Sequence, residues 1–85
     1  MGMGLKAYGL ANANKNAPIK FYLRELRLDA HGYYRGTAYF GRQRGTRVYE
    51  VESEDNQVYF TERARDRDHA KELVRKRFPY ARFFR

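Results

Sequence analysis

Arginine is the residue with the most evident chemistry in this chain. Thirteen arginines and five lysines stand against ten acidic residues in 85 positions, and the formal net charge is +8. The planar guanidinium donates several hydrogen bonds in a fixed geometry that fits phosphate and carboxylate groups. A charge excess of this size also attracts polyanions over a distance. We therefore expect an acidic partner, and nucleic acid, either DNA or RNA, is the first candidate.

The basic residues are unevenly distributed along the chain. Residues 42–49 carry a net charge of +3 and residues 63–85 carry +6, whereas residues 50–62 between them carry −5. Clustered cations give affinity for a phosphate backbone with little discrimination between bases. The predicted phosphate-binding residues are Lys20, Arg42, Arg44, Arg47, Arg63, Arg65, Arg67, Lys71 and Arg75.

Catalytic and metal-binding chemistry has little support in the sequence. His31 and His69 lie in different predicted elements, and Ser53 is the only serine, so a nucleophilic triad cannot be assembled. Glu50 and Glu52 alternate along a strand and point the same way without converging on a cation. The chain has no cysteine, which excludes disulfides and thiolate metal sites. We expect a non-enzymatic protein with no metal, no cofactor and no small-molecule substrate.

Alternating apolar residues and turn-forming residues predict four short strands. Their expected bounds are residues 19–28, 33–41, 46–52 and 57–61. Because the connections are short and rich in turn residues, neighbouring strands are expected to pair as hairpins. The predicted fold is therefore α+β, an antiparallel β-meander of three to four strands packed on one C-terminal α-helix.

The C-terminal part of the chain predicts the helix, over residues 66–78. Asp66 is suited to the N-cap, and Pro79 ends the helix. The helical spacing gives an apolar face formed by Ala70, Leu73, Val74 and Phe78. The aromatic tail after Pro79 is expected to fold back on the domain. Residues 1–18 are expected to form a loosely ordered N-terminal arm, and residues 19–85 a single α+β domain.

The register of the predicted hairpins, in which Val51 is expected opposite Val58, assigns strand residues to two faces. The face toward the helix is expected to hold Ile19, Phe21, Leu23, Tyr34, Ala38, Phe40, Tyr49, Val51, Val58 and Phe60. The other face is rich in tyrosine and more apolar than a face exposed only to water. The alternative function is thus a protein-interaction module, a phage-type inhibitor or a homodimer, whose open face binds an acidic protein or a second copy. Its expected interface residues are Tyr22, Leu26, Tyr33, Arg35, Tyr39 and Tyr59.

The predicted meander also separates charge between the two ends of the sheet. The turn at residues 42–47, the connector at residues 63–67 and Lys20 fall at one end, together with the start of the helix. The acidic residues Asp29, Glu54 and Asp55 fall at the other end. The sequence therefore predicts one strongly positive pole, where phosphates are expected to bind.

The strand that ends with residues 58–61 and the helix that begins with residues 66–73 together resemble parts of known families. This ending resembles the arm-type DNA-binding domains of tyrosine recombinases and small phage proteins that inhibit host enzymes. Residues 70–73 are similar to the basic second helix of double-stranded-RNA-binding domains. These resemblances imply nucleic-acid or protein binding, and no residue role is carried over from them.

The hydropathy of the chain bears on its location. No apolar run approaches the roughly 20 residues that span a bilayer, and residues 1–10 lack the apolar stretch of a signal peptide. We expect a cytoplasmic protein without a membrane partner.

Overall fold

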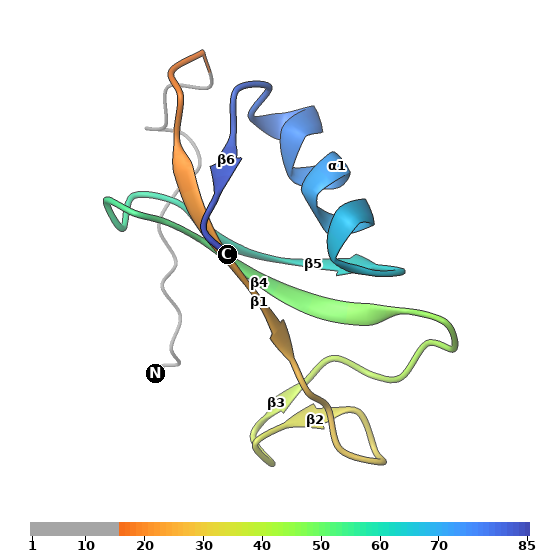
Figure 1. Cartoon of the computed structure of the whole chain (residues 1–85). Helices are drawn as coiled ribbons and strands as arrows, with labels where there is room; N and C mark the ends of the chain where they lie inside the picture. Colours follow the sequence, from red (N-terminus) through yellow and green to blue (C-terminus); the bar gives the residue numbers. More distant parts are fainter. Residues whose placement is uncertain (1–15) are drawn as a thin grey trace.

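The computed structural model describes residues 16–85, which form a sheet covered on one face by a single helix (Figure 1). The main sheet has the strand order β5-β4-β1-β6, and a separate small sheet holds β2 and β3. The main strands are β1 (Lys20–Leu26), β4 (Arg47–Ser53), β5 (Tyr59–Ala64) and β6 (Arg82–Phe83). The helix is α1 (Arg67–Arg77), and the small sheet consists of β2 (Tyr33–Tyr34) and β3 (Ala38–Tyr39).

The α+β class is confirmed, but the order and direction of the strands differ from a meander. β1 pairs directly with β4 in antiparallel fashion, with Leu23 opposite Val51. β6 adds to the other edge of β1 in parallel orientation, so the main sheet is mixed. The segment between β1 and β4 therefore leaves the sheet and returns to it, instead of contributing a central strand.

The prediction of one continuous strand at residues 33–41 is wrong, because this segment folds back on itself. Arg35 and Gly36 both have positive φ, 53° and 74°, and reverse the chain between β2 and β3. The carbonyl of Gly32 then accepts hydrogen bonds from the amides of Phe40 (2.9 Å) and Gly41 (3.1 Å). The result is a compact excursion, which we call the hairpin (residues 28–41). Three residues expected in the core belong to it instead, namely Tyr34, Ala38 and Phe40.

The helix follows the expectation closely. The Asp66 side chain caps its N-terminus by accepting a hydrogen bond from the amide of His69 at 2.8 Å. The face toward the sheet buries Ala70, Val74 and Phe78 completely. The ring of Phe78 meets that of Phe21 from β1 at 5.3 Å between centroids. Burial of such aromatic rings provides much of the stability of a small domain.

The aromatic tail folds back, as expected, and becomes β6. The amides of Arg82 and Phe84 donate to the carbonyls of Ile19 (2.8 Å) and Phe21 (2.9 Å) on the edge of β1. Beyond β6, the guanidinium of Arg67 donates to the carbonyls of Leu23 and Phe84. Arg67 thus continues the hydrogen-bonding of this edge where the short strand ends.

β4 and β5 pair in antiparallel fashion, as predicted, but their register differs by two residues from the predicted register. Val51 lies opposite Phe60, whereas the predicted partner was Val58. A shift by two keeps every side chain on its face, so the predicted core residues of these strands remain in the core. The longer connection is stabilised by the buried hydroxyl of Ser53, which accepts hydrogen bonds from the amides of Gln57 and Val58.

The predicted N-terminal arm, residues 1–18, lies outside the described residues except for its last three positions. Between residues 16 and 85, no helix has the length and apolar character needed to cross a membrane. The same part of the chain has no group of three or more potential metal-ligating side chains.

Candidate nucleic-acid interface

An open hollow of about 490 Å³ lies where β1 ends and β4 begins, and we call it the basic hollow. Its lining contains four arginines and a single carboxylate; the lining residues are Glu25, Leu26, Arg27, Leu28, Arg42, Gln43, Thr46, Arg47, Val48 and Arg63. The Glu25 carboxylate lies 3.4 Å from the guanidinium of Arg47. The other three guanidinium groups keep their charge without an acidic side-chain partner among residues 16–85, so the hollow carries an excess of positive charge.

Two of these arginines also shape the hollow. The guanidinium of Arg63 donates to the carbonyls of Phe40 (2.6 Å) and Gly41 (3.0 Å) and to the hydroxyl of Thr46 (3.1 Å). These bonds hold residues 40–46 over the face of the sheet that the helix leaves open. Arg42 donates to the carbonyl of Asp29 at 2.9 Å and fastens the base of the hairpin. Neutral carbonyls fix both guanidinium groups in place without cancelling their charge.

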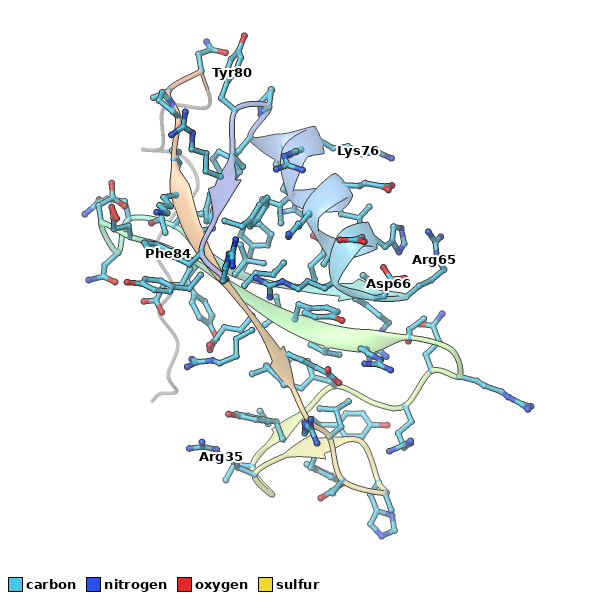
Figure 2. All side chains as sticks on the ribbon, viewed as in Figure 1. Arg35, Arg65, Asp66, Lys76, Tyr80 and Phe84 are labelled. Atoms are coloured by element: carbon cyan, nitrogen blue, oxygen red, sulfur yellow. The ribbon has the colours of Figure 1, made fainter. Side chains whose placement is uncertain are left out.

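Arg44 follows the lining residue Gln43 on the loop before β4, and Arg65 lies two residues after the lining residue Arg63, directly after β5; neither side chain lines the basic hollow. Both side chains are exposed, and neither has a hydrogen-bond or ion-pair partner among residues 16–85. Figure 2 shows Arg65 beside Asp66 at the start of the helix, with its side chain directed away from the sheet. These two cations can therefore be reached by a ligand from solvent.

The start of the helix contributes less positive charge than the sequence suggested. Asp66 occupies the N-cap, and Asp68 adds a second carboxylate in the first turn. The amide of Arg65 donates to Nδ1 of His69 at 3.0 Å. Since carboxylates at these positions complement the helix dipole, the helix terminus is satisfied within the chain.

Four of the predicted phosphate-binding residues lie away from the basic hollow. Lys20 is at the opposite end of β1, with its ammonium 4.1 Å from the ring centroid of Phe84, because β1 pairs with β4 and not with the next segment. Arg67 is half-buried and bonded to backbone carbonyls. Lys71 and Arg75 lie over the ring of Phe83, at 5.8 Å and 5.0 Å.

The acidic residues are divided differently from the prediction. Asp29, expected at the far end, lies beside the basic hollow, where the amides of Tyr33 and His31 hold the pKa of its carboxyl below the usual range. Glu54 and Asp55 lie in the connection between β4 and β5, at the far end of the sheet. On the open face, Glu50 pairs with Arg24 and accepts a hydrogen bond from the hydroxyl of Tyr59 at 2.7 Å. Carboxylates thus occur along this face and beside the hollow itself, but among the residues that line the hollow the arginines outnumber the carboxylates four to one.

The residues expected to form a tyrosine-rich protein interface are divided between the main sheet and the hairpin. Tyr22 and Tyr59 are on the open face of the main sheet, where the ring of Tyr22 stacks on Phe84 at 4.3 Å. Leu26 belongs to the same face but is only 3 % exposed. The other three, Tyr33, Arg35 and Tyr39, lie on the hairpin.

One arginine of the basic hollow was missed from the sequence. Arg27 follows β1 directly, and in a meander it would have fallen at the end opposite to Arg47. Only the direct pairing of β1 with β4 brings the two residues to the same end. In the sequence, the sign that Arg27 lies at an end of the sheet is its position after an apolar strand and before the turn at Asp29.

Comparison of the chain with protein-family models, with curated proteins and with solved structures finds no match.

Proposed function

We propose that this chain is a small, non-enzymatic nucleic-acid-binding domain that contacts phosphates at the basic hollow and through the neighbouring Arg44 and Arg65. The observation that supports this proposal is the lining of the hollow, in which four guanidinium groups accompany one carboxylate. Cations fixed by backbone carbonyls are already in position before a phosphate arrives, which lowers the entropy cost of binding. The acidic residues of the open face and of the far turn disfavour phosphate contact elsewhere on the sheet.

The alternative, a protein-interaction module on a tyrosine-rich sheet face, has weaker support. Its expected residues are divided between the sheet and the hairpin, and Leu26 is buried. We therefore propose nucleic acid, and not an acidic protein or a second copy of the chain, as the partner.

The test is a pair of double variants with the same net charge. Arg44→Glu with Arg65→Glu and, as the control, Lys76→Glu with Arg82→Glu each lower the net charge from +8 to +4, since every reversal removes two charges. The control residues are exposed and lie at the far end of the helix and on β6. Binding of labelled DNA and RNA would be measured across a salt series, with circular dichroism to check folding.

We expect the wild type to bind with a strong salt dependence, and the first pair to weaken binding far more than the control. The slope of log affinity against log salt should fall by about 1 to 2 in the first pair, because each lost phosphate contact removes about 0.9. If the two pairs weaken binding equally, binding depends on the total charge of the chain and not on this site, and the proposed site is contradicted. No binding by the wild type at low salt would overturn it.

A further inference from the structure

The hairpin beside the basic hollow presents two tyrosine rings to solvent. Tyr39 is 66 % exposed and Tyr33 is 38 % exposed. The two rings face each other across β2 and β3, with centroids 5.0 Å apart and an angle of 57° between the planes. Burial of aromatic rings usually stabilises a small domain, but these two rings remain exposed and contact each other. Such an exposed aromatic pair is suited to bind a ligand with flat apolar surfaces.

The tyrosine pair is held close to the phosphate-binding arginines by the backbone. Arg42, in the lining of the hollow, follows Tyr39 by three residues, a distance of at most about 10 Å along an extended chain. Arg63 donates to the carbonyls of Phe40 and Gly41, the two residues directly after β3. The rings and the cations are therefore connected by a short stretch of backbone that Arg63 holds in place.

A further cation lies at the outer turn of the hairpin. Arg35 has a φ of 53° and is exposed, with its guanidinium 5.3 Å from the ring centroid of Tyr34 (Figure 2). Cations thus lie at the tip of the hairpin, at Arg35, and just beyond its base, at Arg42. This arrangement along the hairpin, with a cation, two aromatic rings and a second cation, fits a nucleic-acid strand, in which phosphates and bases alternate.

We infer that the ligand of the proposed phosphate site is single-stranded nucleic acid, with one or two unpaired bases stacked on Tyr39 and Tyr33. This inference rests on the proposed function, because it needs the phosphates to bind at the basic hollow. Exposed aromatic rings beside a cationic groove bind single strands through base stacking, and every base has a face that can stack. Paired bases in a duplex offer no such face to a ring at the surface, so the tyrosine pair adds little affinity for a duplex.

Three probes of equal length, about 12 nucleotides, separate the base contribution from the phosphate contribution. The first is a single-stranded oligothymidine, the second is the same strand with abasic sites in place of the bases, and the third is a duplex. Affinities would be measured by fluorescence anisotropy at one low salt concentration. We expect the wild type to bind the base-bearing strand at least about fivefold more tightly than the abasic strand, which carries the same phosphates.

Three tyrosine variants localise the effect. Tyr39→Ala should lose most of the preference for the base-bearing strand, while Tyr39→Phe, which keeps the ring, should retain it. Tyr80→Ala is the control, since Tyr80 is 60 % exposed but lies beyond the helix, away from the hairpin (Figure 2). Its preference should equal that of the wild type.

The possible failures are distinguishable. If the wild type binds none of the three probes, the proposed function itself fails. If it binds the base-bearing and abasic strands equally, the phosphate site stands and base stacking is overturned. If the wild type binds the duplex more tightly than the single strand, and Tyr39→Ala does not change this, the single-strand inference is also overturned.

Discussion

At the scale of single residues, the arginines of this chain perform two different tasks. Arg63 and Arg67 direct their guanidinium groups at backbone carbonyls and hold a loop and a strand edge in place. Arg44 and Arg65 are exposed and make no such bonds with residues 16–85. Composition cannot distinguish the two groups, because the difference depends on which carbonyls the fold leaves without a partner.

Ser53 is the polar residue on which the turn between β4 and β5 depends. It is fully buried, and its hydroxyl donates to Asp55 at 2.7 Å and accepts from the amide of Val58 at 2.9 Å. The hydrogen bond from Ser53, followed by that from the amide of Gln57, holds the pKa of the Asp55 carboxyl below its usual range. We expect Ser53→Ala to cost about 1–3 kcal/mol of unfolding free energy, because the amide of Val58 is left buried without an acceptor.

The same substitution has a predictable pH dependence. A carboxyl whose pKa is lowered by folding stabilises the native state above its ordinary pKa, and this contribution disappears as the pH falls through the lowered value. Ser53→Ala should raise the pKa of Asp55, and the stability difference from the wild type should be largest near neutral pH and shrink in acid. Denaturant unfolding at several pH values and NMR titration of Asp55 measure both effects. An unchanged pKa of Asp55 in the variant would contradict this account.

At the scale of elements, the local features were predictable and the long-range pairing was not. The helix, its Asp66 cap and the hairpin of β4 and β5 follow from neighbouring residues, and the sequence predicts them. The pairing of β1 with β4 depends on residues 27–46 closing on themselves, which requires positive φ at Arg35. A non-glycine residue rarely adopts that conformation, so the sequence carries little warning of this turn. The basic hollow was only partly predictable for the same reason, since Arg27 joins it through this pairing.

Two glycines of the hairpin provide a matched test of its closure. A Cβ on Gly32, which has a φ of 88°, would lie 2.7 Å from the Cα of Gly41, whereas a Cβ on Gly36 would meet nothing within 4 Å. Gly36→Ala should therefore cost only the left-handed backbone strain, about 1–2 kcal/mol. Gly32→Ala should cost more, because backbone atoms must also move apart.

Amide hydrogen exchange reports this difference where it arises. The amides of Phe40 and Gly41, which donate to the carbonyl of Gly32, should exchange much faster in Gly32→Ala than in Gly36→Ala. The amides of β4 should keep their protection in both variants. Equal exchange at Phe40 in the two variants would mean that the contact between Gly32 and Gly41 does not hold the hairpin closed.

At the scale of the whole molecule, the fold brings arginines from distant parts of the sequence together at one end of the sheet. The direct pairing of β1 with β4 brings Arg27, Arg42, Arg47 and Arg63 around one hollow. The acidic Glu54 and Asp55 remain at the far turn, and Glu50 lies on the open face between the two ends. Under the proposed function, a ligand that carries phosphates binds at this end of the sheet, where the tyrosine pair of the hairpin also lies.

The most direct test of this account is a map of the contact surface on the folded wild-type protein. Backbone amide chemical shifts would be recorded by NMR while a single-stranded oligonucleotide is added at low salt. We predict that the shifts concentrate at Arg27, at residues 33–47 and at residues 63–66, and leave residues 54–57 and 76–82 unchanged. Shifts that concentrate on Tyr22, Phe84 and the open face of the sheet, or the absence of any shift, would contradict the assignment of the basic hollow as the phosphate site.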